Sequence, residues 1–279
     1  MKILYTSSDF NCWRKTISPS NSVGFVPTMG ALHGGHLSLV EASLKNADIT
    51  IVSIFVNPKQ FSRDEDFDTY PRDLEDDLNK LKQYNVDVVF VPEFGDIYGN
   101  PGDAVVFDDP FSKTLEGASR PHFFPGVLDV VSRLFNIVNP DFAHFGRKDA
   151  QQLILIEKMV GDLGSPITII PGETIRESSG LAMSSRNEYL TDEQKKSAEV
   201  IFKSLKSAKK LLDSGVVDSD VVRELIKNIM ATEKIIEVDY VSIVHLDGLL
   251  EVNHEIGGEV LISIAVIINS IRLIDNIFY

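Results

Sequence analysis

Two histidines, His33 and His36, stand three residues apart in a turn that follows the apolar segment Val23–Val26. Gly34 and Gly35 lie between them and let backbone N–H groups approach a ligand closely. The helix expected to begin near His36 adds about half a positive charge at its N-terminus, where phosphates bind readily. Histidines at this spacing share one helix face. The turn therefore predicts a site for a nucleotide triphosphate.

Two other interpretations of the histidine pair remain open at this point. A His-x-x-His pair can bind zinc, but the chain has one cysteine, Cys12, and no third ligand at a suggestive spacing nearby. The pair can also consist of an ordinary capping histidine and a core histidine. What favours phosphate chemistry is that further turns suited to phosphate follow other predicted strands.

Composition limits the class of protein. The 279 residues are 43% hydrophobic and 24% charged, enough for a large core and for two domains. The net charge of -14, without a long cluster of Lys and Arg, argues against a nucleic-acid partner. The longest apolar run, 260–269, is about half of what a bilayer requires, so no membrane partner is expected. No signal-peptide pattern is visible and the lone Cys12 excludes an internal disulfide, so we expect a cytoplasmic protein.

Apolar strand candidates alternate with amphipathic helix candidates through residues 1–172. The predicted strands are 23–26, 49–56, 86–92, 141–145 and 167–170, and the predicted helices begin near His36 and Pro71 and span 127–138 and 149–160. This alternation is typical of an α/β fold with a doubly wound parallel, Rossmann-like sheet. A ligand is expected at the carboxyl ends of its strands.

Residues 173–279 have a different texture. Two charged helix candidates, 191–213 and 219–232, precede two strand candidates, 238–246 and 259–268. They predict a smaller α+β C-terminal domain. The connecting segment 171–189 is polar and rich in Gly and Ser, which suits a hinge, a lid or a plain linker.

Polar groups follow the second predicted strand. Asn57 and Gln60 are placed to hydrogen-bond a small polar ligand, although Asn-Pro also favours an ordinary turn. Further on, Asp76 and Asp77 lie in an acidic helix start. Such runs are mostly solvated helix faces, and the alternative is a Mg²⁺ site, because magnesium takes one or two protein carboxylates.

Three later segments complete the set of candidates. Residues 116–121, Glu-Gly-Ala-Ser-Arg-Pro, are expected to form a loop outside the core, because small residues dominate them. At the fourth predicted strand, Arg147 and Lys148 suit a phosphate and Gln152 suits a hydroxyl group. In the connecting segment, the two hydroxyls and the guanidinium of 184–186 can wrap a triphosphate.

With these motifs in order, the chain resembles the pantoate–β-alanine ligase family, nucleotidyltransferases with a HIGH-like motif that are related to class I aminoacyl-tRNA synthetases. The resemblance covers almost the whole chain. It is carried by residues 27–36 (PTMGALHGGH), 55–61 (FVNPKQF), 70–72 (YPR), 116–121 (EGASRP), 148–153 (KDAQQL), 181–187 (LAMSSRN) and 272–276 (RLIDN).

The resemblance implies a reaction and assigns residues to it. ATP and pantoate would form pantoyl adenylate and pyrophosphate, and β-alanine would then displace AMP to give pantothenate. His36, with His33 and Lys148, would be catalytic, and His36 would be the proton donor. Gln60, Gln152 and Asn57 would bind pantoate or β-alanine, Asp76 and Asp77 would hold Mg²⁺, and the protein would be a homodimer. The ATP-binding residues would be Met29, Gly30, Ala31, Leu32, His33, Gly34, Gly35, His36, Gly146, Arg147, Lys148, Asp149, Ile175, Met183, Ser184, Ser185 and Arg186.

The chain departs from the usual family pattern in a few places. Where the family commonly has Arg-Pro-Gly-His-Phe-Arg/Asp-Gly, this chain has Arg-Pro-His-Phe-Phe-Pro-Gly at 120–126. Phe123 thus replaces the usual histidine and Pro125 fixes its own φ, so a locally different backbone is expected. Gly34 replaces a common acidic residue, and Ser179 stands where Asp is frequent. Two rival functions remain: a nucleotidyltransferase for another acid or for a phosphate ester, and a catalytically silent nucleotide-binding protein.

Overall fold

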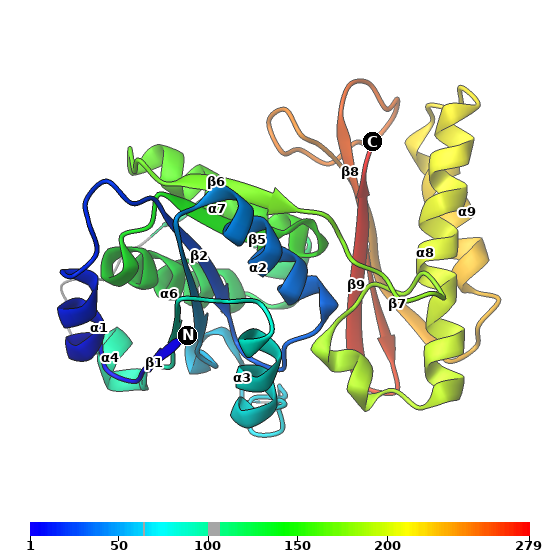
Figure 1. Ribbon diagram of the computed structural model, residues 1–279. Coiled ribbons are helices and arrows are strands. Elements are labelled where there is room, and N and C mark those ends of the chain that lie inside the picture. Colours follow the sequence, from blue (N-terminus) through cyan, green and yellow to red (C-terminus); the bar gives the residue numbers. More distant parts are fainter. Residues whose placement is uncertain (64, 100–106) are drawn as a thin grey trace. The chain divides into compact units, whose positions relative to one another are not determined.

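The computed structural model describes residues 1–63, 65–99 and 107–279 (Figure 1). Within them the chain forms two compact units, Met1–Glu173 and Thr174–Tyr279. Each unit has its own sheet, one with six strands and one with three. In the described part of the chain no helix is both long and apolar enough to cross a membrane.

The first unit is built on a fully parallel sheet in the order β1-β4-β3-β2-β5-β6. Its strands are β1 (Lys2–Leu4), β2 (Val23–Thr28), β3 (Ile49–Ile54), β4 (Val88–Phe90), β5 (Phe142–Gly146) and β6 (Thr168–Gly172). The helices are α1 (Ser7–Arg14), α2 (Gly34–Asn46), η1 (Pro58–Gln60), α3 (Leu74–Lys82), α4 (Phe94–Tyr98), η3 (Pro110–Lys113), α5 (Glu116–Ser119), α6 (Phe123–Val138), η4 (Arg147–Asp149) and α7 (Ala150–Asp162). This architecture confirms the predicted α/β, Rossmann-like class.

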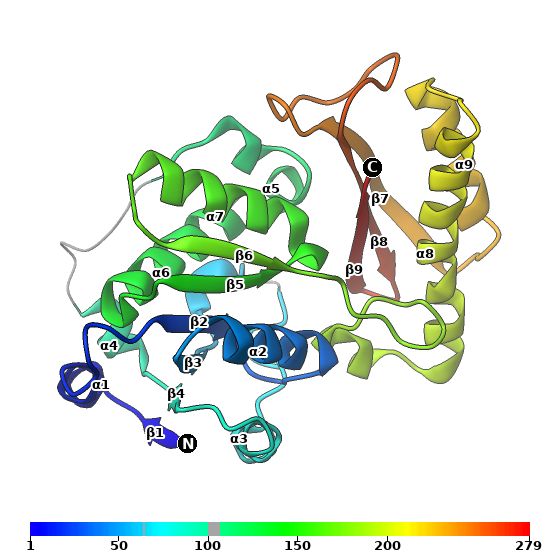
Figure 2. The same cartoon turned by 45° about the horizontal axis from the view of Figure 1, so that its top comes forward.

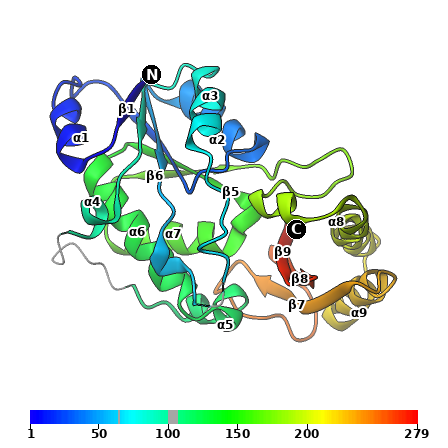
Figure 3. The same ribbon diagram turned by 90° about the horizontal axis from the view of Figure 1, so that it is seen from below.

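Helices cover both faces of this sheet. Figure 3 shows α2 and α3 on one side of the strands and α6 and α7 on the other. On the α2 side, Val26, Val52 and Leu81 are fully buried in one apolar cluster. On the α6 side, the ring of Phe135 meets those of Phe25 and Phe145 edge-on, with centroids 6.4 and 6.3 Å apart. Burial on both faces explains why these strands are almost continuously apolar.

The strand order places two predicted turns side by side. Strand β2 pairs with β3 on one side and with β5 on the other, so the order of the sheet reverses between β2 and β5. Ligands in doubly wound sheets bind where the order reverses, outside the carboxyl ends of the strands. The turn that carries His33 follows β2, and the turn that carries Lys148 follows β5. Two distant segments of the sequence thus meet at one edge.

Three local predictions in this unit need correction. Helix α2 begins at Gly34, before His36, because His33 is its N-cap. Helix α6 begins at Phe123, four residues earlier than expected, with Pro125 in its first turn, where a missing N–H costs no helical hydrogen bond. The supposed loop at 116–121 contains a short helix, α5, and Glu116 is buried (6% exposed). Its N–H donates to the side chain of Gln151, a helix-to-helix contact that composition does not reveal.

The second unit is an antiparallel sheet with two helices packed along it (Figure 2). The sheet order is β7-β8-β9, with β7 at Ile236–His245, β8 at Val260–Ile268 and β9 at Ile271–Phe278, and the helices are η5 (Ser185–Tyr189), α8 (Asp192–Asp213) and α9 (Ser219–Met230). Apolar side chains of α8, α9 and the sheet form one core, which includes Leu205, Ile226 and Ile262. Strand β9 was not predicted, because Arg272, Asp275 and Asn276 interrupt its apolar pattern.

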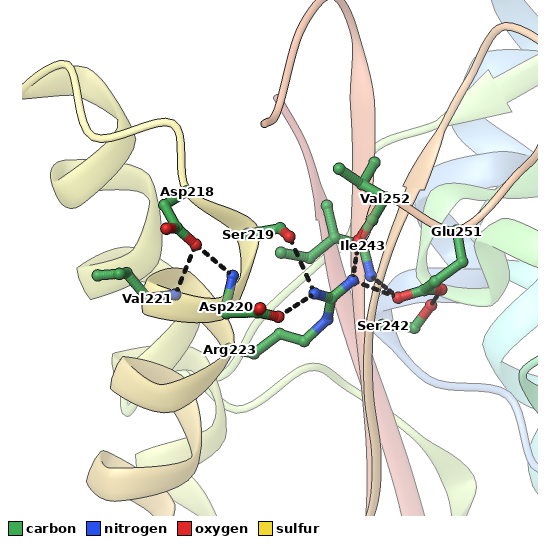
Figure 4. Close-up of polar contacts among 9 residues, drawn as sticks. All are labelled: Asp218, Ser219, Asp220, Val221, Arg223, Ser242, Ile243, Glu251 and Val252. Carbon is green, nitrogen blue, oxygen red and sulfur yellow. Dashed lines mark hydrogen bonds and ion pairs between the residues drawn. The ribbon is translucent and has the colours of Figure 1, made fainter. Parts of the chain in front are cut away.

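An arginine fastens the loop between β7 and β8 to helix α9 (Figure 4). The guanidinium of Arg223 donates to Ser219 Oγ at 3.0 Å, to the Glu251 carboxylate at 2.7 Å and to the carbonyl of Val252. Glu251 also accepts from the N–H of Ile243 at 3.1 Å. The Arg223–Glu251 pair is a structural cross-link within the second unit. None of the hydrogen bonds described for it involves a predicted site residue.

Candidate functional site at the ends of β2 and β5

The turn after β2 has an unusual backbone. Gly30 has φ +80° and Ala31 has φ +51°, both in the left-handed region. A side chain at Gly30 would place its Cβ 2.9 Å from the carboxylate of Asp77, so glycine is required there for both conformation and space. A left-handed Ala31 is strained by itself and persists because its surroundings hold it.

The carboxylate of Asp77, in α3, holds this turn. One oxygen accepts the N–H of Leu32 at 2.7 Å and the other accepts the N–H of Ala31 at 2.9 Å. Lys80, one helical turn further on, donates to the carbonyl of Leu32 at 2.6 Å. Burial raises the pKa of Asp77, and the two backbone hydrogen bonds partly offset this effect. Helix α3 therefore clamps the backbone directly before His33.

These contacts bear on the predicted magnesium site. Asp77 is 1% exposed and directs both oxygens to backbone N–H groups, while Asp76 pairs with Lys80 at 2.5 Å. Among the described residues, no group of three or more His, Cys, Asp and Glu side chains is arranged to hold a metal ion. The two carboxylates do not fit a magnesium site as they stand.

The two histidines cap helix α2 and still keep one donor each. His33 Nδ1 accepts the N–H of Gly35 at 3.1 Å, and His36 Nδ1 accepts the N–H of His33 at 3.4 Å. The rings lie side by side with centroids 4.1 Å apart. In a neutral imidazole whose Nδ1 accepts, the proton is on Nε2. Both rings thus make capping hydrogen bonds, and each keeps an Nε2–H group that could donate to an anion.

Both imidazoles are neutral at physiological pH. Burial, followed by the positive charge of Lys148, lowers the pKa of His33 to about 4. Burial, followed by His33 and then Lys148, lowers the pKa of His36 to about 3. These effects also show that Lys148, from the turn after β5, lies near both histidines. Lys80 contributes in the same direction, so the arrangement offers two neutral donors beside two cations, Lys148 and Lys80.

We expect acid to destabilise the fold through these histidines. Unfolded histidine titrates near pH 6.5, whereas folded His33 and His36 titrate near 4 and 3, so the unfolded chain binds more protons below 6.5. The free energy of unfolding should fall as pH decreases from 6.5 to 4. In His33→Asn, which keeps an N-cap side chain, urea unfolding at pH 7, 5.5 and 4.5 should give a shallower pH dependence. If the free energy of unfolding depended equally on pH in the variant and the wild type, the lowered pKa of folded His33 would be contradicted.

Gln60 is fixed next to the turn after β2. Its side-chain nitrogen lies 2.9 Å from the sulfur of Met29, and its side-chain oxygen accepts from the amide of Asn57 at 3.3 Å. Asn57 also donates to the carbonyl of Gly126 at 3.0 Å and accepts from Tyr98 Oη at 2.8 Å and from the N–H of Lys59 at 3.2 Å. All four hydrogen-bonding positions of this amide are therefore used inside the protein. The geometry assigns Asn57 to holding Gln60, in place of the predicted substrate contact.

The predicted residues after β5 lie at the start of helix α7. Gly146 ends the strand, Arg147–Asp149 form η4, and Gln152 is partly buried in the first turn of α7. Lys148 is 19% exposed, with its ammonium 3.6 Å from the Asp149 carboxylate. Arg147 pairs with Glu173 at 3.3 Å. Of the two cations in this turn, Lys148 is the one whose charge lowers the pKa of both histidines.

The remaining predicted residues belong to the second unit. The N–H of Met183 donates to the carbonyl of Ile175 at 2.9 Å, which brings these two together. Ser184 caps η5 by accepting the N–H of Arg186 at 3.3 Å, and Ser185 is buried. The structure thus gives these residues a defined local conformation.

Sequence reasoning missed Lys80 and Tyr98. Lys80 contacts the turn backbone and Tyr98 holds Asn57. The only signal for Lys80 was its position three residues after Asp77, on the same helix face. Nothing in the sequence linked Tyr98 to Asn57, since 41 residues separate them.

Comparisons with known proteins agree over the full length. The sequence model of the family described as pantoate-beta-alanine ligase matches residues 2–278. A pantothenate synthetase from Acetivibrio thermocellus is 47% identical over 278 residues, 99% of each chain, and one from Thermosipho africanus is 47% identical over 94% of each.

Solved structures give the same result. A pantothenate synthetase from Thermus thermophilus matches with a TM-score of 0.92 and 37% identity over 99% of both chains. A pantoate-beta-alanine ligase from Francisella tularensis, complexed with beta-gamma ATP and beta-alanine, matches with a TM-score of 0.81 and 33% identity over 99% of this chain and 97% of its own. Fold, ordered motifs and close relatives all agree, and the chain belongs to the pantoate-beta-alanine ligase family of enzymes.

Proposed function

We propose that this enzyme condenses pantoate with β-alanine at the expense of ATP, by way of a pantoyl adenylate. In the first step the pantoate carboxylate attacks the α-phosphorus of ATP and pyrophosphate leaves. In the second step the amine of β-alanine attacks the acyl carbon, AMP leaves, and pantothenate forms. The overall condensation extends to this chain what the names of its relatives say of them, and the adenylate is the intermediate that the family resemblance implies.

The observation that carries the proposal is the pair of neutral imidazoles beside Lys148. A carboxylate nucleophile is already ionised at neutral pH, so the first step needs no general base. What it needs is stabilisation of the charge that develops on the α-phosphate and the leaving pyrophosphate. His33 and His36 each keep an Nε2–H donor, and Lys148 supplies a positive charge close to both. His36 is proposed to donate a hydrogen bond from its neutral Nε2–H to the α-phosphate, in place of the proton transfer that the family resemblance implies.

The substrate preference follows from the amides. Gln60 and Gln152 are the proposed ligands of pantoate, and Gln60 also faces β-alanine. Gln60 is held by Asn57 and by Met29 of the ATP-binding turn, so its position is coupled to that turn. Uncharged donors suit hydroxyl groups and one carboxylate, whereas a phosphate ester would call for more cations.

Magnesium belongs to the proposal as the counter-ion of the ATP phosphates, where it would neutralise charge on the departing pyrophosphate. The local geometry assigns Asp77 to the turn backbone and pairs Asp76 with Lys80. The remaining proposed ATP ligands are Ile175 and Met183–Arg186. We further propose a homodimer located in the cytoplasm, and the mass of the assembly in solution tests the first of these.

We expect the segment that contains Ser184, Ser185 and Arg186 to become resistant to protease when substrates bind. Two hydroxyls and a guanidinium suit the phosphates of ATP, and shielding of the adenylate from water would favour attack by the amine. Limited proteolysis with and without ATP plus pantoate measures the protection. An unchanged cleavage rate in this segment would remove it from the proposal.

Pyrophosphate release across a panel of acids tests the function itself. We expect release with ATP and pantoate, and none with ATP and phosphate esters of similar size. Absence of turnover with pantoate would refute the substrate assignment in favour of another nucleotidyltransferase. Absence with every acid would favour a catalytically silent nucleotide-binding protein.

A further inference from the structure

A second arginine–glutamate pair, Arg120 and Glu65, lies beside Gln60, and the proposed mechanism gives neither residue a role. The Nε and Nη2 atoms of Arg120 donate to the two carboxylate oxygens of Glu65 at 2.8 and 2.7 Å. The side chains are 12% and 21% exposed, so water screens the pair only partly. Two parallel charge-assisted hydrogen bonds of this kind fix direction as well as distance.

The same guanidinium reaches the main chain of the candidate site. Arg120 Nη2 donates to the carbonyl oxygen of Gln60 at 3.3 Å. The guanidinium also stacks on the ring of Phe123, 4.0 Å from its centroid, and His122 Nε2 lies 3.5 Å from Glu65. Two of the residues at which this chain departs from the family pattern, His122 and Phe123, therefore contact the pair.

The carboxylate is charged when it makes these contacts. Burial alone raises the pKa of Glu65, but the hydrogen bond and the positive charge of Arg120 outweigh it and hold that pKa below its ordinary value. The pair thus persists through the neutral pH range.

Gln60 is consequently held from two directions. Asn57 and Met29 contact its side chain, while Arg120 contacts its backbone and ties it to Glu65, five residues further along the chain. A one-ångström displacement of a positioning group can cost about 100-fold in rate, so such a connection matters.

We propose that the Arg120–Glu65 pair is a positioning element that sets the orientation of Gln60 and, through it, the affinity for pantoate. This inference rests on the proposed function, because it assigns pantoate to Gln60. Neither Arg120 nor Glu65 touches the substrate in this scheme. Their effect is transmitted through the hydrogen bond from Arg120 to the carbonyl of Gln60.

The test uses Glu65→Gln and Arg120→Lys in the full-length protein. Glu65→Gln keeps the shape and removes the charge, and Arg120→Lys keeps the charge and removes the planar fork. The matched control is Glu251→Gln, which weakens the Arg223–Glu251 pair in the second unit (Figure 4). We expect the KM for pantoate to rise about 10-fold or more in Glu65→Gln and in Arg120→Lys. The KM for ATP should stay within about 2-fold, and the control should change neither.

A readout without turnover keeps the inference separate from the proposed function. The side-chain amide NMR signal of Gln60, assigned with Gln60→Ala, should shift and broaden in Glu65→Gln and stay in place in Glu251→Gln. If wild type shows no turnover with pantoate, the proposed function fails and this signal alone decides on the positioning. An unchanged signal, or an unchanged KM for pantoate with a loss of stability equal to that of the control, would overturn the inference.

Discussion

Replacing His36 by alanine is expected to slow pyrophosphate release by about 100-fold or more, the scale of removing one transition-state donor. The structure gives the physical reason. His36 Nδ1 is occupied by the N–H of His33, so the Nε2–H of a neutral ring is what the alanine variant removes from the phosphate. Rapid-quench measurement of the first turnover, with ATP and pantoate, reports this step directly.

A control variant separates chemistry from helix capping. His36 sits at the third position of helix α2, where a glutamine side chain also completes a capping box. His36→Gln should therefore recover the stability lost in His36→Ala without recovering the rate. A wild-type rate in His36→Ala would refute the role given to this residue.

Replacing Asp77 by asparagine is expected to reduce both stability and rate. The amide offers one oxygen where the carboxylate offered two, so one buried N–H of the pair at Ala31 and Leu32 loses its acceptor and faces an NH₂ group. Hydrogen bonds to charged groups contribute about 1.5–3 kcal/mol, and we expect a loss of about 2–3 kcal/mol in the free energy of unfolding. The strained turn should also relax, with a fall in kcat of about 10-fold or more.

Asp87→Asn provides the comparison for Asp77. Asp87 accepts the N–H of Thr50 at 2.8 Å, next to the amino-terminal end of β3 and thus away from the carboxyl-end turns. Chemical denaturation should show a stability loss for both variants, and steady-state kinetics should show a rate loss for Asp77→Asn alone. Equal kinetics in the two variants would mean that the clamp on the turn serves folding only.

The sequence predicted the architecture well because its signals are local. Runs such as Val23–Val26 are apolar throughout since a parallel sheet buries both faces, and the turns after β2 and β5 carry the polar residues. Short or polar-interrupted elements gave no such signal. Strand β1 has three residues, and β9 contains Asp275, which is buried because Arg176 pairs with it at 2.6 Å.

The site was predictable in its residue types and less so in their roles. The histidine spacing indicates an anion site, but it does not show that both Nδ1 atoms cap the helix, since this depends on ring orientation. The acidic run at Asp76 and Asp77 suggests a metal, whereas tertiary packing directs Asp77 to a backbone 45 residues away. Contacts between segments so far apart follow from the fold alone.

The central claim is that an acyl adenylate forms at the turns after β2 and β5. Acid quench of the enzyme with radiolabelled ATP and pantoate, in the absence of β-alanine, measures it most directly. We predict one equivalent of a pantoyl adenylate per active site, formed with pyrophosphate and consumed on addition of β-alanine to give AMP and pantothenate. Pyrophosphate release only when β-alanine is present, with no adenylate at any time, would contradict the account.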